Sequence, residues 1–118
     1  MIVDDEENIV NLVKAIFEQE KFEVIIANTG KECLEKLNKV KPDLILMDMM
    51  MPGMTGKETT KKIRENPKTK DIKIVFLSVA RLSEVGKEEL KNLKVLDYIT
   101  KPFDNDELVR KVKRIICE

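Results

Sequence analysis

The sequence lacks the residues that mark several kinds of site and location. It has no histidine and only two cysteines, Cys33 and Cys117, whose spacing matches neither a metal site nor a disulfide framework. Its 22 basic and 22 acidic side chains balance, so no net charge draws it to nucleic acid or a membrane. No apolar run approaches the roughly 20 residues that cross a bilayer, and the first residues do not resemble a signal peptide. We therefore expect a reducing, cytoplasmic location.

The length of 118 residues suits one domain with a substantial core, but not two domains. The chain has no internal repeat, low-complexity tract or linker, so a single domain is expected over residues 1–118. No DNA-binding or enzymatic segment follows Glu118 in this sequence. The chain is therefore expected to be either a stand-alone protein or a piece of a longer one, and monomer and homodimer stay open as alternatives.

Short apolar runs predict five strands. The run from Leu44 to Met47 is apolar throughout and ends at Asp48, shortly before Pro52-Gly53 breaks the backbone, which is typical of a strand buried on both faces. The run from Ile74 to Leu77 has the same character and ends at Ser78. The other strands are expected at residues 1–3, 22–27 and 96–100.

Helical patterns separate these strands. The first helix is predicted by apolar side chains at helical spacing: Ile9, Leu12, Val13, Ile16 and Phe17. Three helices begin with a capping-box pattern, and the first of them continues through Leu34, Leu37 and Val40; the pairs are Thr29 with Glu32, Thr55 with Glu58, and Asp104 with Glu107. A weak helix is expected from Leu82 to Leu93, because Gly86 costs about 1 kcal/mol inside a helix. Alternating strands and helices predict a doubly wound parallel α/β sheet, covered on both faces.

Polar side chains stand where these strands end. Parallel strands place their carboxyl ends along one edge of a sheet, so the following residues are expected near one another: Asp4, Asp5, Glu6, Asp48, Ser78 and Lys101. Clustered carboxylates repel unless a cation neutralises them, and oxygen ligands favour Mg²⁺ before Ca²⁺. A lysine and a hydroxyl beside such a metal could hold a phosphoryl group. The alternative for the first acidic run is a helix start favoured by the helix dipole, which explains Glu6 and Glu7 better than Asp5.

Three motifs in this order resemble a known family. They are Val3-Asp4-Asp5-Glu6, the run from Asp43 to Asp48 with Met51-Pro52-Gly53-Met54-Thr55-Gly56, and the run from Asp97 to Phe103, which includes Lys101-Pro102. Together they look like the receiver domain of two-component response regulators, over the whole chain. The resemblance implies a flavodoxin-like sheet with strand order 2-1-3-4-5. The segment 81–93 matches the family less well, and Lys94-Val95-Leu96 replaces its usual Gly-Ala.

The resemblance also implies a phosphoacceptor and a metal site. Asp48 would be the phosphorylated carboxylate. Asp5 would ligate Mg²⁺ directly, Asp4 would act mainly through water, and the backbone carbonyl of Met50 would complete the protein's share. Lys101 would pair with a phosphoryl oxygen.

A switch is implied as well. Ser78 would hydrogen-bond the phosphoryl group, and Tyr98 would move from an exposed to a buried rotamer; the alternative is that Tyr98 is an ordinary half-buried strand residue. The Lys101-Pro102 bond would be cis. Of Met49, Met50 and Met51, one or two are expected to pack on the core and at least one to be exposed. Met50 and Ala80 would flank the path of the hydrolytic water.

We therefore expect a signalling switch, phosphorylated on Asp48 by a histidine kinase or phosphotransfer protein and presenting the face around residues 81–100 to a downstream effector or output domain. Such a domain assists its own phosphorylation but is not a conventional enzyme. A flavin- or nucleotide-binding domain of the same topology is less favoured, because it needs a Gly- or Ser/Thr-rich phosphate loop where Asp4-Asp5-Glu6-Glu7 stands. A degenerate receiver that only binds partners is disfavoured by the intact set of site residues.

Overall fold

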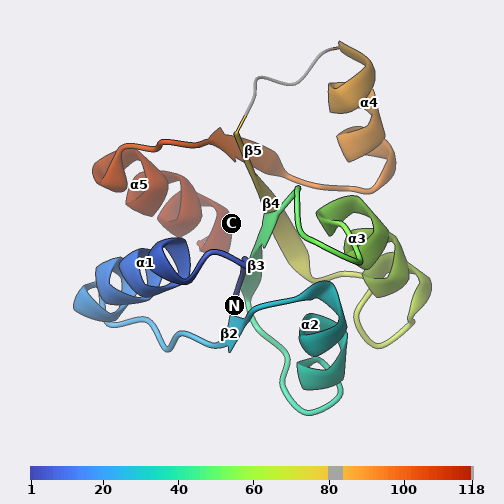
Figure 1. The fold of residues 1–118 in the computed structure, drawn as a ribbon, viewed down its shortest axis with the longest axis horizontal. Coiled ribbons are helices and arrows are strands. Elements are labelled where there is room, and N and C mark those ends of the chain that lie inside the picture. Colours follow the sequence, from blue (N-terminus) through green and yellow to red (C-terminus); the bar gives the residue numbers. More distant parts are fainter. Residues whose placement is uncertain (80–83, 118) are drawn as a thin grey trace.

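The computed structural model describes residues 1–79 and 84–117 (Figure 1). Within these residues, five parallel strands form one sheet in the order β2-β1-β3-β4-β5. The strands are β1 (Ile2–Val3), β2 (Ile26–Ala27), β3 (Leu44–Asp48), β4 (Lys73–Ser78) and β5 (Asp97–Thr100). The helices are α1 (Glu7–Gln19), α2 (Gly30–Lys36), α3 (Gly56–Glu65), α4 (Glu84–Asn92) and α5 (Asn105–Ile116). The predicted fold class and strand order are confirmed.

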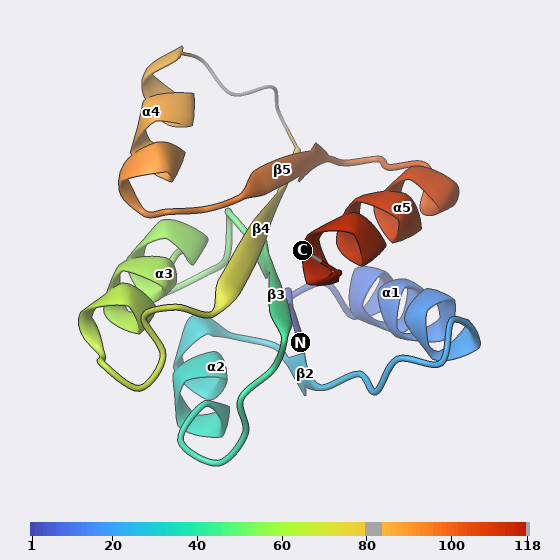
Figure 2. The same cartoon turned by 180° about the vertical axis from the view of Figure 1, so that it is seen from behind.

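Helices cover both faces of the sheet, as Figures 1 and 2 show from opposite sides. Helices α1 and α5 lie together on one face, whereas α2, α3 and α4 lie on the other. Each face of the sheet has its own hydrophobic core, and alternate residues of the central strands point into one core or the other. Leu46 packs with α1 and α5, while Ile45 packs with α2 and α3. All five residues of β3 are buried, which explains why its first four residues, Leu44 to Met47, are all apolar.

Register brings the polar strand ends to one edge. Asp48 pairs with Leu77, the residue before Ser78, and Ser78 pairs with Thr100, the residue before Lys101. On the other side of β3, Val3 pairs with Met47, so Asp4 follows at the same level as Asp48. The predicted gathering of these side chains is therefore a direct consequence of the strand order.

Several expected boundaries shift. Strand β2 has two residues instead of the predicted six, because its partner in the sheet is β1, which also has two. Helix α2 ends at Lys36, and the chain continues to Val40 in tight turns. Helix α4 begins at Glu84; the predicted start at Leu82 lies outside the described residues. None of the described helices has the length and apolar character needed to cross a membrane.

The helix patterns are confirmed in part. In α1 the buried stripe is Val10, Val13 and Phe17, and Leu12 lies off it with 42% of its surface exposed. Thr55 and Glu58 form the predicted capping box at the start of α3. Thr29 also caps α2, but Asp104 caps α5 by accepting from the backbone of Asp106 instead of Glu107, so no capping box forms there.

Candidate functional site

Three carboxylates meet at the carboxyl edge of the sheet. One oxygen each from Asp4, Asp5 and Asp48 lie within 4.8 Å of one another. Asp4 and Asp48 are buried, with 0% and 4% of their surface exposed, whereas Asp5 is exposed. The two buried carboxylates therefore form the floor of the site, and Asp5 stands at its opening.

Backbone bonds fix the two buried carboxylates. The amide of Asp4 donates to the carbonyl of Ala27 in β2 (3.1 Å), and Asp4 Oδ1 accepts from the amide of Glu6 (2.9 Å). Asp48 ends β3, and its Oδ1 accepts from the amide of Met50 (3.3 Å). The loop after β3 then folds back so closely that a Cβ on Gly56 would lie 2.2 Å from the Asp48 carbonyl oxygen. Glycine at position 56 is thus needed for the shape of this loop.

Lys101 reaches the carboxylates from the end of β5. Its Nζ lies 2.7 Å from Asp4 Oδ2, 3.6 Å from Asp48 Oδ1 and 3.8 Å from Glu6 Oε1. Its amide donates to the carbonyl of Ser78 (2.6 Å), and the Lys101-Pro102 peptide bond is cis, as predicted. The ammonium group is buried, so it compensates the carboxylates in an environment where water screens weakly.

Burial and mutual charge interactions shift the pKa values of Asp48 and Lys101. Burial, with the neighbouring charge of Asp4, raises the pKa of Asp48 from 3.8 to about 7, although Lys101 and the Met50 amide act against that rise. Burial opposes the charge on Lys101, but its bond to Asp4 and the charges of Asp48 and Glu6 raise its pKa above the ordinary value. One ammonium group thus does not fully offset the repulsion between the carboxylates. An all-oxygen donor set with such uncompensated charge fits a hard divalent cation.

The remaining predicted residues lie around this edge. Ser78 is buried at the end of β4, beside the strand that carries Asp48. Tyr98 is half-buried in β5 and packs against the core on the α3 side. Among the methionines, Met51 is buried, Met49 half-buried and Met50 69% exposed, which confirms the expected mixture. Ala80, the other predicted flank of the site, lies outside the described residues.

Sequence reasoning missed two features of this site. It paired Lys101 with a future phosphoryl group and did not anticipate its bond to Asp4. The second is that Glu6 has both of its predicted places at once. Its carboxylate lies 3.8 Å from Lys101 Nζ at the predicted edge, and Glu6 is also the N-cap residue of α1.

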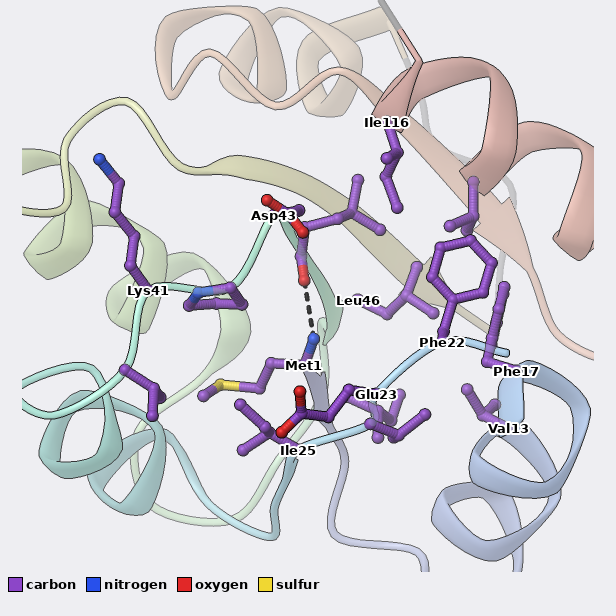
Figure 3. Close-up of a pocket in the computed structure, with 16 residues that line it drawn as sticks. Met1, Val13, Phe17, Phe22, Glu23, Ile25, Lys41, Asp43, Leu46 and Ile116 are labelled. Atoms are coloured by element: carbon purple, nitrogen blue, oxygen red, sulfur yellow. Dashed lines mark hydrogen bonds between the residues drawn. The ribbon is translucent and has the colours of Figure 1, made fainter. Parts of the chain in front are cut away.

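A cavity of about 360 Å³ opens elsewhere, near the amino ends of β1 and β3 (Figure 3). Its walls are mainly apolar and include Phe17, Phe22 and Ile116. The ammonium group of Met1 donates to the carbonyl of Leu44 (2.8 Å) there, and burial lowers the pKa of that group to about 6. Among the predicted site residues that the structure describes, none lines this cavity, so its chemistry is separate from that of the carboxylate edge.

Comparison with known proteins gives a consistent result. The family model described as response regulator receiver domain matches residues 1–113. The alkaline phosphatase synthesis transcriptional regulatory protein PhoP of Bacillus subtilis is 37% identical over 116 residues, which are 98% of this chain and 47% of that protein. The transcriptional regulatory protein CpxR of Escherichia coli is 35% identical over 98% of this chain and 48% of its own length. The chain thus spans about half the length of these curated relatives.

Solved structures show the same similarity. The chemotaxis protein CheY4 of Vibrio cholerae superimposes with a TM-score of 0.90 and 32% identity, over 97% of this chain and 94% of that one. The receiver domain of a sensor histidine kinase from Pseudomonas aeruginosa gives a TM-score of 0.87 and 25% identity, over 99% and 95% of the two chains. In that structure a magnesium ion is coordinated in the active site cleft.

Proposed function

The chain belongs to the response regulator receiver domain family, whose members are signalling proteins, and from that premise we propose that it is a switch controlled by phosphorylation of Asp48. The observation that carries the proposal is the buried carboxylate of Asp48 beside Asp4, Asp5 and Lys101 at one edge of the sheet. Each of these side chains has a separate part in phosphoryl transfer.

Asp4, Asp5 and Asp48 are the proposed holders of Mg²⁺, with the backbone carbonyl of Met50 as the remaining protein ligand. Asp5 would ligate the ion directly and Asp4 would act mainly through water, because Asp4 is already bonded to Lys101 and to the amide of Glu6. Bound Mg²⁺ supplies charge neutralisation for the phosphoryl oxygens. Three carboxylates whose oxygens lie within 4.8 Å of one another support a divalent cation here, and burial together with the charge of Asp4 raises the pKa of Asp48 in the metal-free site.

Asp48 is the proposed nucleophile. One of its oxygens forms a bond to phosphorus while the bond from phosphorus to the donor nitrogen breaks, and the electron pair remains on the donor's imidazole. Lys101 then moves its ammonium group toward a phosphoryl oxygen, a short step because Nζ is already 3.6 Å from Asp48 Oδ1. Catalysis of this kind depends on positioning and charge, so the domain assists its own modification without being a conventional enzyme.

Histidine kinases or histidine phosphotransfer proteins are the proposed donors, and a downstream effector or output domain is the proposed reader of the modified state. Ser78 and Tyr98 are the proposed switch residues. The hydroxyl of Ser78 would gain a charge-assisted bond to the phosphoryl group, and Tyr98 would follow by changing its exposure. A two-state rearrangement shifts only through such differential contacts.

A labelling experiment tests the chemistry. Incubation with Mg²⁺ and acetyl phosphate should add one phosphoryl group that is acid-stable and alkali-labile, as expected of an acyl phosphate. Removal of Mg²⁺ with a chelator should prevent the addition. Asp43→Asn is the matched control, since Asp43 is an exposed carboxylate just before β3, and it should leave labelling unchanged.

The switch needs its own variant. Ser78→Ala should still accept the phosphoryl group, yet show a weaker change in hydrogen exchange across residues 84–100. An equal response in wild type and Ser78→Ala would remove Ser78 from the switch without affecting the assignment of Asp48.

A further inference from the structure

Glu6 is an exposed carboxylate directly beside Lys101. Glu6 Oε1 lies 3.8 Å from Lys101 Nζ, and 56% of the Glu6 side chain is exposed. Within the described residues, the other carboxylates at ion-pair distance from Lys101 are those of Asp4 and Asp48, and both are buried. A molecule that approaches Lys101 from solvent therefore passes the charge of Glu6 as well as that of the exposed metal-ligand candidate, Asp5.

Backbone bonds hold Glu6 in this place. Its amide donates to Asp4 Oδ1 (2.9 Å), and its carbonyl accepts from the amide of Val10 (3.1 Å) as α1 begins. Glu6 is the N-cap residue of α1, but its side chain makes no capping hydrogen bond. The carboxylate is thus not engaged by its own helix and lies toward Lys101.

The charge of Glu6 matters because of the net charge of the groups around it. When all three are ionised, the carboxylates of Asp4, Asp5 and Asp48 carry three negative charges. Two positive charges on a divalent cation and one on Lys101 balance them. Glu6 then leaves one uncompensated negative charge at the mouth of a site that must admit a negatively charged phosphodonor.

We propose that Glu6 selects among phosphodonors by charge, disfavouring small dianionic donors such as acyl phosphates. The proposal rests on the proposed phosphorylation of Asp48. A rim charge acts mainly on the rate of encounter, and its effect falls as salt screens it. The logarithm of the effect scales with the charge of the donor, so a dianion is disfavoured more strongly than a monoanion.

Glu6→Gln tests the proposal, because it removes the charge and keeps the shape. Initial phosphorylation rates are measured at saturating Mg²⁺ and low ionic strength with acetyl phosphate, a dianion at neutral pH, and with phosphoramidate, a monoanion. The expected gain with acetyl phosphate is about two- to threefold, from one charge acting on a dianion across a few ångströms of screened solvent. The gain with phosphoramidate should be about the square root of that factor, and both gains should vanish at high salt.

Glu7→Gln is the matched control. Glu7 is exposed at the first position of α1, and the variant removes the same charge one residue farther from the site. Its rates should change much less than those of Glu6→Gln. Equal effects of the two variants would overturn the proposal, and so would an unchanged or slower rate in Glu6→Gln.

A second substitution keeps the test independent of shape. Glu6→Lys reverses the charge, so its gain with acetyl phosphate should be about the square of the gain in Glu6→Gln. A slower reaction in Glu6→Lys would contradict charge selection. Both results presume label on the wild type; if the wild type takes no label, it is the proposed phosphorylation of Asp48 that fails.

Discussion

At the scale of single residues, Asp48 is unusual because it carries a titratable carboxyl group although only 4% of the residue's surface is exposed. Its pKa rises from 3.8 to about 7, mainly through burial and the nearby charge of Asp4. Between those two values the folded protein keeps a proton that the unfolded chain has lost. The contribution of Asp48 to the free energy of unfolding of the metal-free protein should therefore fall as pH rises from about 4 to about 7.

Asp48→Asn removes this penalty. In the presence of a chelator, the variant should gain on the wild type as pH rises through that window, by about 1–3 kcal/mol at pH 8. Urea unfolding of both proteins at pH 5 and pH 8 measures the difference. Asp43→Asn, the exposed control, should show no such trend, and parallel pH profiles for wild type and Asp48→Asn would mean that the carboxyl group titrates normally.

Met50 gives a prediction about the lifetime of the phosphorylated state. Hydrolysis of the acyl phosphate needs a water in line with the bond to Asp48, and Met50 offers no strong hydrogen bond to orient it. Its side chain is 69% exposed, so it does not pack in the core and is free to cover the phosphoryl group. Met50→Asn should therefore lose phosphate faster than wild type, as measured in a time course whose samples are quenched with a chelator. Equal rates would show that the side chain has no part in hydrolysis.

At the scale of elements, Arg64 joins α3 to two other segments. Its guanidinium donates to the carbonyls of Leu93 (2.8 Å) and Lys94 (3.2 Å) after α4, and to those of Lys70 (2.8 Å) and Ile72 (2.7 Å) before β4. These bonds satisfy carbonyl groups that turns otherwise leave without partners. The C-terminal end of α4 is therefore fixed to α3.

Arg64→Ala should destabilise the fold by about 2–3 kcal/mol, because it leaves partly buried carbonyls unpaired. The stability of Arg64→Lys should lie between those of wild type and Arg64→Ala, since an ammonium group cannot reproduce the planar fork of the guanidinium. Lys61→Ala, at an exposed position of the same helix, is the control and should change stability little. Hydrogen exchange should rise near residues 93–95 in Arg64→Ala. Protection equal to that of wild type would contradict the inference that Arg64 fixes the end of α4 to α3.

The sequence predicted an element well where residues adjacent in the chain carry its signal. The apolar run of β3 and the capping box at Thr55 are both made of such adjacent residues, and both were predictable. The length of β2 depends on β1, and the exposure of Leu12 depends on how α1 sits against the sheet, so neither follows from local pattern. The same distinction holds at the sheet edge, where the order of the strands predicted that Asp48 and Lys101 lie near each other but not the bond from Lys101 to Asp4.

At the scale of the whole molecule, the proposed metal site should couple to folding. Asp4 and Asp5 lie in the loop after β1 and Asp48 at the end of β3, so the unfolded chain does not hold the three carboxylates together. Mg²⁺ should therefore raise the melting temperature by mass action, equivalent to about 2.7 kcal/mol at a hundredfold excess over Kd. Asp5→Asn should abolish the rise, whereas Asp43→Asn should keep it. An unchanged melting temperature of the wild type in millimolar Mg²⁺ would contradict a metal site.

Phosphorylation of Asp48 would place the phosphoryl group on a single side chain, and chemical trapping identifies that side chain. After incubation with acetyl phosphate and Mg²⁺, borohydride reduces an acyl phosphate of aspartate to homoserine, which peptide mass spectrometry locates. Homoserine is expected at position 48 alone, and none anywhere in Asp48→Asn. Homoserine at Asp4, Asp5 or any other position of the wild type, or label that survives in Asp48→Asn, would contradict phosphorylation of Asp48.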